Sequence, residues 1–243
     1  MWPRRLTRAV ALVPLALLVT WDAPERWTPE PRQPHEAAAR PAAPRPAIVG
    51  RASWHADETA VREKPRYAGS VAAVFVHHTD HPHDYDCRAD VPGMLRAMQD
   101  DHTHGEGWDD LGYNFVVDRC GTIYEGRAGG VDRAVVGAHT KGFNTGSTGI
   151  AALGHFGAGE EVPRPMLEAI AALAAWKLRP GADPRGRVRM VSTNDASRYP
   201  KGTSVELDVI AGHRDGYETD CPGGALYGRL PWLREEAARL RSP

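Results

Sequence analysis

Apolar residues fall into short runs along the chain from about residue 48 onward, and these runs predict β-strands. The run at 71–77 is apolar without alternation, which is typical of a strand buried on both faces of a sheet. Further strands are expected at 113–118, 122–125, 148–153 and 207–210. The first two of these flank a turn at 119–121, so they should form an antiparallel hairpin.

Helices are expected where apolar residues recur at a spacing of three and four. One helix follows Asp90, a candidate N-cap, because the apolar residues behind it fall on one helical face: Val91, Met94, Leu95 and Met98. A second is expected at 163–178. A last helix carries the stripe Leu226, Leu230, Leu233, Ala237 and Leu240. Strands that alternate with helices, with one hairpin among them, predict an α/β domain whose mixed central β-sheet is flanked by helices.

The segment before residue 48 lacks the pattern of a folded domain. Arg4, Arg5 and Arg8 precede an apolar run at 9–19, which is too short to span a bilayer comfortably and suits the core of a signal peptide. No Ala-x-Ala cleavage motif follows, so residues 1–23 are interpreted as a signal peptide or an N-terminal anchor. Residues 24–47 are rich in proline and predict a disordered linker. Residues 48–243 then form one domain.

Charge and cysteine content narrow the partners and the compartment. The net charge of −1 and the pI near 6.8 indicate no basic face, so nucleic acid is not an expected partner. A membrane is expected only through a retained 1–23 segment, and we expect a monomer. Export would favour a disulfide among the three cysteines. Because Cys221 is a candidate metal ligand, Cys87 and Cys120 are the expected pair, with two reduced, buried thiols as the alternative.

Two histidines and one cysteine lie beside turn residues. His77 ends the apolar run, and His213 and Cys221 share a stretch that is bracketed by glycine and proline. Catalytic zinc takes three such protein ligands and leaves a fourth position for water. Ligands in open α/β sheets bind beyond strand ends, where one cleft could hold both histidines. The alternative is a buried histidine, a reduced cysteine and an unrelated histidine.

Three neighbouring residues carry weaker signals. His78 follows His77 on a strand, so it should point to the opposite face and pack behind the site instead of sharing the metal. Tyr113 begins a strand, where its phenol could donate to a developing oxyanion, although a tyrosine at the edge of the core is an equal alternative. Thr219 precedes Cys221 by two residues and is short enough to reach an open coordination position.

Six stretches in order resemble the family of peptidoglycan recognition proteins and zinc-dependent type 2 N-acetylmuramoyl-L-alanine amidases. The resemblance covers nearly all of residues 48–239, and its motifs are highly specific in combination. The stretches are Arg-Ala-Ser-Trp at 51–54, Val-His-His-Thr at 76–79, Gly-Trp-Asp-Asp-Leu-Gly-Tyr-Asn-Phe at 107–115, Tyr-Glu-Gly-Arg at 124–127, Gly-Ala-His-Thr at 137–140 with Asn144, and 212–223.

This resemblance implies a role for each matching residue. His77, His213 and Cys221 match zinc ligands, Tyr113 matches a catalytic tyrosine, and Thr219 matches a position that is lysine in phage relatives. Positions that line or support the glycopeptide groove are matched by His139, Thr140, Asn144, Trp108, Asn114 and Arg127. The implied reaction is hydrolysis of the amide bond between the lactyl group of N-acetylmuramic acid and L-alanine of the stem peptide.

Three functions compete at this point. The first is an exported amidase with Zn²⁺ as cofactor and peptidoglycan, a muramyl peptide, as partner, acting outside the cell or in the cell wall. It departs from cytoplasmic relatives at Ala151, where they carry a glutamate proton acceptor. The second is a module that binds peptidoglycan without cleaving it; such relatives typically lack the ligand that Cys221 supplies. The third, a thiol hydrolase with Cys221 as nucleophile, leaves His77 unexplained.

Overall fold

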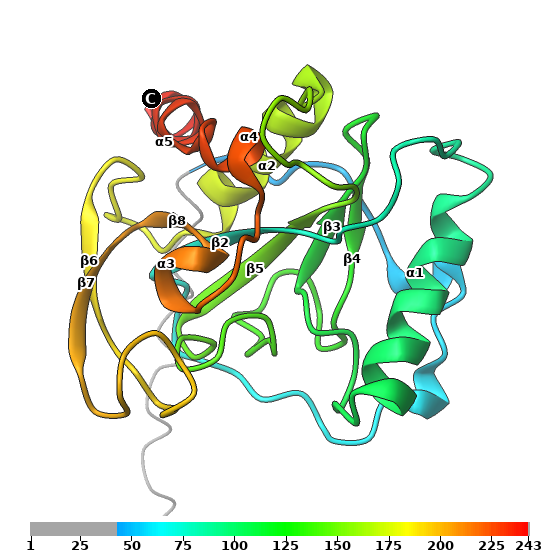
Figure 1. Cartoon of the computed structure of the whole chain (residues 1–243), viewed down its shortest axis with the longest axis horizontal. Helices are drawn as coiled ribbons and strands as arrows, with labels where there is room; N and C mark the ends of the chain where they lie inside the picture. Colours follow the sequence, from blue (N-terminus) through cyan, green and yellow to red (C-terminus); the bar gives the residue numbers. More distant parts are fainter. Residues whose placement is uncertain (1–42, 243) are drawn as a thin grey trace, which may run out of the picture. The chain divides into compact units, whose positions relative to one another are not determined.

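Six strands form the central sheet of the computed structural model, which describes residues 43–242. The expected segment 1–23 and most of the linker 24–47 lie outside the described residues. The sheet order is β1-β4-β3-β5-β2-β8 (Figure 1). Only β3 and β4 run antiparallel, so the sheet is mixed as predicted. The strands are β1 (Ile48–Val49), β2 (Ala73–His78), β3 (Phe115–Val117), β4 (Ile123–Glu125), β5 (Ser147–Ala152) and β8 (Ile210–Gly212).

One face of the sheet is covered by α2 (Arg164–Lys177) and α5 (Leu230–Arg241), which pack against each other (Figure 1). Their apolar faces meet Val74 and Val76 of β2 together with Ile150 of β5 in the largest core cluster. The side chains of Val74, Val76 and Ile150 are fully buried, and the hydrophobic effect of burying them stabilises the packing of the helices on the sheet. The uninterrupted apolar pattern of β2 therefore reflects its central position.

The opposite face is covered by two separate elements, which lie at opposite sides of the view in Figure 1. Helix α1 (Val91–Asp100) packs in a cluster with Ala151, and the hairpin of β6 (Arg187–Val191) and β7 (Ser204–Asp208) packs in a cluster with Phe75. His77 pairs in register with Ala151 and follows Phe75 by two residues on the same face. His77 therefore emerges between these two clusters.

The structure corrects three expectations about the second half of the domain. The hairpin of β6 and β7 was not predicted, because most of its side chains are exposed and their alternation involves few apolar residues. The expected strand at 207–210 is divided at Val209, so that β7 joins the hairpin and β8 joins the central sheet. The last apolar stripe belongs to two helices, α4 (Gly224–Tyr227) and α5, rather than one.

Short helical turns complete the described chain and place residues around the sheet. They are η1 (Arg51–Trp54), η2 (Glu58–Ala60), the π-turn η3 (Asp101–Gly105) that extends α1, and α3 (His213–Gly216). Cys87 and Cys120 form the expected disulfide, with 33 residues of sequence separation. Closing a loop of this length contributes about 4 kcal/mol in the chain-entropy model. In the part of the chain that is described, no helix combines the length and apolarity needed to cross a membrane.

Candidate metal centre

The register of two neighbouring parallel strands brings His77 and His213 together. Val76 of β2 pairs with Gly212 of β8, so the next residue of each strand lies at the same edge of the sheet. The two imidazole rings that follow have centroids 4.4 Å apart. Gly212 N–H donates to Asp215 Oδ2 at 2.8 Å, and Asp215 Oδ1 accepts from Tyr227 Oη at 2.7 Å. These bonds hold the turn that carries His213, whereas Asp215 carries no separate signal in the sequence.

Cys221 reaches this edge from the loop after α3. Its Sγ lies 3.8 Å from Nδ1 of His77 and accepts a hydrogen bond from the His78 backbone N–H at 3.3 Å. One potential ligand atom from each of His77, His213 and Cys221 lies within 4.8 Å of the other two. The structure thus brings together the three side chains that the sequence singled out.

Burial sets the protonation state of this group. Desolvation lowers the pKa of His213 to about 4, and it holds the pKa of the completely buried His77 well below the ordinary range. It also raises the pKa of Cys221 to about 12, and this effect of burial outweighs the His78 N–H and the Arg214 guanidinium, which both favour the thiolate. Neutral imidazoles present lone pairs, and a divalent cation would supply the positive charge that a thiolate needs. The donor set therefore fits a zinc-type metal.

His139 and Thr140 lie behind His77 and not on an open groove. The His139 ring nitrogen Nδ1 is 3.2 Å from Nε2 of His77, and Thr140 Oγ1 is 3.4 Å from the same atom. Both residues are buried, and burial lowers the pKa of His139 to about 3. A Cβ on Gly149 would approach the His139 ring to 2.4 Å, so this strand position has room only for glycine. Both residues therefore contact His77 from behind, and their expected role in lining or supporting a glycopeptide groove stays a prediction.

Tyr113 borders the cluster on the side of α1. Its ring centroid is 5.2 Å from that of His77, and burial raises the pKa of its phenol, so the group stays a neutral donor. His102, on the π-turn after α1, packs its ring edge-on against Tyr113 at 5.7 Å and accepts from the Gly112 N–H at 3.1 Å. The Trp108 ring packs against His102 at a tilt of 33°, with centroids 4.6 Å apart. The turn after α1 thereby positions Tyr113.

The remaining predicted residues hold the backbone around the cluster. Thr219 Oγ1 accepts from the Cys221 N–H at 3.2 Å. Asn144 Oδ1 accepts from the backbone N–H groups of His139 and Thr140. Asn114 is buried and bonds to Gly149 and Val135, while Arg127 donates to carbonyl oxygens of residues 110 and 111 ahead of Tyr113. Their observed contacts are mostly with backbone groups, which explains why single residues gave weak signals.

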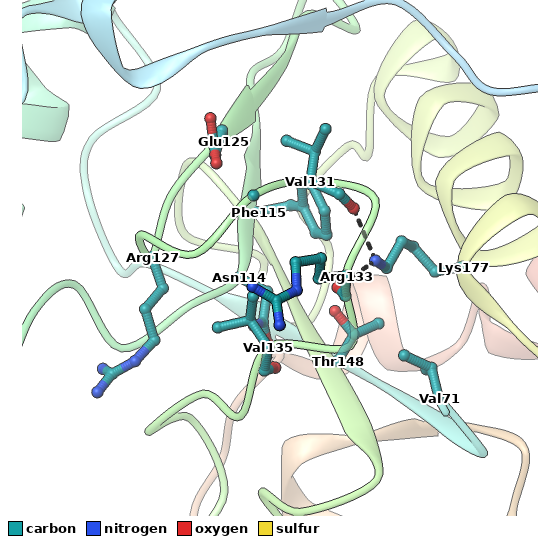
Figure 2. Close-up of a pocket in the computed structure, with 11 residues that line it drawn as sticks. Val71, Asn114, Phe115, Glu125, Arg127, Val131, Arg133, Val135, Thr148 and Lys177 are labelled. Carbon is teal, nitrogen blue, oxygen red and sulfur yellow. Dashed lines mark hydrogen bonds between the residues drawn. The ribbon is translucent and has the colours of Figure 1, made fainter. Parts of the chain in front are cut away.

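A small pocket elsewhere in the domain contains none of the three candidate ligands (Figure 2). Lys177 of α2 points into it and donates to the carbonyl oxygens of Val131 and Arg133 at 2.7 and 2.8 Å. Burial lowers the pKa of this amine to about 8, and the nearby Thr148 Oγ1 has no partner among the described residues. The pocket lies where α2 meets the loop at 130–135.

Known proteins match most of this domain. The sequence model of the N-acetylmuramoyl-L-alanine amidase family matches residues 67–224. Peptidoglycan-recognition protein LB of Drosophila melanogaster is 29% identical over 184 residues, which are 75% of this chain and 67% of that protein. The N-acetylmuramoyl-L-alanine amidase of Sus scrofa is 34% identical over 194 residues, which are 78% of this chain and 28% of that protein. The chain thus spans a minor part of the pig amidase's length.

Solved structures give the same match at the level of the fold. The wild-type Drosophila PGRP-LB structure superimposes with a TM-score of 0.58 at 27% identity, covering 76% of this chain and 92% of that one. The structure of peptidoglycan recognition protein LE in complex with tracheal cytotoxin, a monomeric diaminopimelic acid-type peptidoglycan, gives 0.59 at 28% identity and covers 76% and 93%.

Proposed function

The chain belongs to the family of peptidoglycan recognition proteins and N-acetylmuramoyl-L-alanine amidases, and from this premise we propose that it is an exported zinc-dependent amidase. The proposed reaction is hydrolysis of the bond between the lactyl group of N-acetylmuramic acid and L-alanine in peptidoglycan. One observation carries the proposal: His77, His213 and Cys221 converge at one edge of the sheet with donor atoms within 4.8 Å. A module that only binds peptidoglycan has no need of this set.

His77, His213 and Cys221 would hold the metal. Bound zinc supplies a Lewis acid that polarises the scissile carbonyl and activates water for attack. The Cys221 thiol must lose its proton to serve as a ligand, and a bound cation would stabilise the thiolate that burial disfavours. The raised pKa of Cys221 also argues against a metal-free thiol hydrolase, because such an enzyme needs a thiolate at neutral pH.

The chain's own groups then orient the ligands and stabilise charge. His139 and Thr140 would fix the ring of His77 through its Nε2, as partners of metal-binding histidines commonly do. Tyr113 would donate its phenolic proton in a hydrogen bond to the oxyanion of the tetrahedral intermediate. Ala151 pairs with His77 and offers no carboxylate there, so proton transfer at this position differs from that in relatives with glutamate. Thr219 would orient Cys221 and face the reacting carbonyl.

Partners and location follow from the same premise. Relatives with this fold have been solved with tracheal cytotoxin, a peptidoglycan fragment, which supports a muramyl peptide as the ligand of this chain. We further propose that residues 1–23 direct export or anchor the protein, that residues 24–47 form a linker, and that the domain at 48–243 works as a monomer outside the cell or in the cell wall.

The test is cleavage of purified cell walls by the full chain, followed by labelling of newly exposed L-alanine amino groups. The reaction is run with the purified protein, after chelation, and after zinc is returned. Loss on chelation, recovery with zinc, and an inactive Cys221→Ala variant that still folds would support the amidase. Wall binding without new amino groups at any zinc concentration would leave a binding module, and activity that survives chelation would favour the thiol hydrolase.

A further inference from the structure

A second group of potential ligands lies next to the first, and it involves the adjacent residue of β2. His78, Asp80 and His155 each offer one ligand atom, and these atoms lie within 4.8 Å of one another. The His78 and His155 rings have centroids 5.5 Å apart, and His155 Nδ1 makes a short contact with Asp80 Oδ1. We propose that His78, Asp80 and His155 form a second site for a divalent transition-metal cation of the zinc type.

The donor chemistry selects the class of cation. Two imidazoles and one carboxylate suit zinc, cobalt, nickel or copper, whereas calcium and magnesium favour sites made of oxygen ligands. The set contains no thiol, so it differs from the group at Cys221 in a way that spectroscopy can detect. Three protein ligands leave room for water or a ligand atom from solvent, and Asp80 and His155 are exposed at this edge.

The backbone holds the three residues in place without help from a cation. Residues 79 and 80 follow β2, and their N–H groups donate to the carbonyls of Ala152 and Gly154 at 3.1 and 2.9 Å. Asp80 has a φ of 62°, a left-handed conformation that aspartate tolerates better than most residues. The Gly154 N–H donates in turn to Thr79 Oγ1 at 3.0 Å. These bonds join the segments after β2 and β5, which is why Asp80 and His155 meet.

The imidazole of His78 is held weakly, so it can turn toward a cation shared with Asp80 and His155. The His78 ring makes one long hydrogen bond, from the Phe156 N–H to Nδ1 at 3.4 Å, so its orientation is not fixed by a strong partner.

The proposed site also connects with the first through backbone contacts. The His78 N–H donates to Cys221 Sγ, and the Phe156 carbonyl, next to His155, accepts from the Ala225 N–H at 3.1 Å. A cation on His78, Asp80 and His155 would therefore cross-link the two loops that contact the segment carrying Cys221. Because it would bind the folded chain, it should raise the melting temperature as well. This inference does not depend on the proposed amidase activity.

The competing interpretation is an ordinary surface pair between His155 and Asp80, and the chain contains a matched control for it. His104 and Asp100 form a similar pair, with 2.8 Å between Nδ1 and Oδ1, on α1 and the π-turn that follows. Among the described residues, that pair belongs to no group of three potential metal ligands. The two pairs differ in that a third potential ligand, His78, lies beside the pair of Asp80 and His155.

The experiment is a cobalt(II) titration of the metal-stripped full chain, with calorimetry alongside. Thiolate-to-cobalt charge transfer reports only the Cys221 site, whereas the visible ligand-field absorption reports both. Wild type should show charge transfer that saturates before the ligand-field signal does. His155→Ala should keep the charge transfer and weaken the second phase by more than about tenfold. Asp80→Asn should act in the same direction, and His104→Ala should match wild type.

Cys221→Ser removes the thiol ligand of the first site and leaves the second site unchanged. It should lose the charge transfer while the second phase remains, and this result holds whether or not the protein is an amidase. Identical titrations of wild type, His155→Ala and Asp80→Asn would overturn the proposal and leave a surface ion pair. Loss of both phases in Cys221→Ser and in His155→Ala alike would also overturn it, because a single shared site would then explain the binding. Circular dichroism confirms that each variant is folded.

Discussion

Two consecutive residues of β2, His77 and His78, belong to two different groups of potential ligands, one largely buried and one largely exposed to solvent. His77 is completely buried among neutral partners, and burial holds its pKa well below the ordinary value. His78 is only partly buried, and its group includes the exposed carboxylate of Asp80. Alternation of side chains along a strand produces this difference, because successive residues face opposite sides of the sheet.

The comparison shows how burial gives similar side chains different protonation behaviour and different expected roles. In the group of His77, desolvation keeps the imidazoles neutral, so their lone pairs are available to a cation, whereas the Cys221 thiol becomes a ligand only when a cation displaces its proton. In the group of His78, solvent screens the charges, and backbone hydrogen bonds hold the residues in position. We therefore expect the buried group to dominate catalysis and the exposed one to affect stability and metal content.

Replacing Cys221 tests the buried group most directly. Cys221→Ala should lower kcat/KM for cell-wall cleavage about a thousandfold or more, since loss of a metal ligand removes several kcal/mol of transition-state stabilisation. Metal analysis after dialysis should show the loss of the tightly bound ion. His104→Ala, which removes an exposed histidine on the turn after α1, should behave as wild type. Comparable activity of Cys221→Ala and wild type would refute the division between the two groups.

Tyr113 separates charge stabilisation from metal binding within the same region. Tyr113→Phe should lower kcat by about 10²–10³-fold, the usual effect of removing one oxyanion donor, while the metal content stays unchanged. Tyr67→Phe removes a phenol that donates to the Gly129 carbonyl on the surface and serves as the control. If Tyr113→Phe raised KM and left kcat intact, Tyr113 would be a binding residue instead.

His139 tests whether the partner behind His77 matters. His139→Ala should weaken zinc binding about 10–100-fold, because the ring of His77 loses the group that orients it through Nε2. Competition with a chromogenic chelator measures this change. Added zinc should restore much of the activity of His139→Ala but none of the activity of Cys221→Ala. Unchanged affinity would mean that the 3.2 Å contact does not position the ligand.

The sequence predicted those features that depend on local pattern. The apolar run of β2, the hairpin of β3 and β4 and the inward face of α2 all have periodicities that local physics explains. His77, His213 and Cys221 could be singled out because each stands beside turn residues. The disulfide could be predicted because Cys221 had another candidate role.

Features that depend on distant segments were not predictable in the same way. His139 was expected to line or support a groove, yet its contact with His77 joins residues far apart in the chain and follows from the close approach of Gly149. The pattern around His155 indicates no partner for it, because Asp80 lies 75 residues away in the sequence, on the segment after another strand. The hairpin of β6 and β7 buries few side chains, so its pattern resembles that of a polar loop.

The smallest expected effect is the pH dependence of the metal-free protein. Burial lowers the pKa values of His77, His139 and His213 from 6.5, so between about pH 4 and pH 6.5 the unfolded chain binds more protons than the folded one. The stabilising effect of these neutral rings is present above pH 6.5 and is lost as the pH falls through that window. The melting temperature of the chelated protein should therefore decrease on acidification, by several degrees.

His139→Ala isolates the contribution of one buried ring to that slope. The variant starts from a lower melting temperature because it leaves a cavity, but its melting temperature should fall less steeply with acidification than that of wild type. His104→Ala should keep the wild-type slope, since its imidazole is exposed. Parallel curves for all three proteins would show that burial does not hold His139 neutral, and the contrast between the groups of His77 and His78 would then rest on geometry alone.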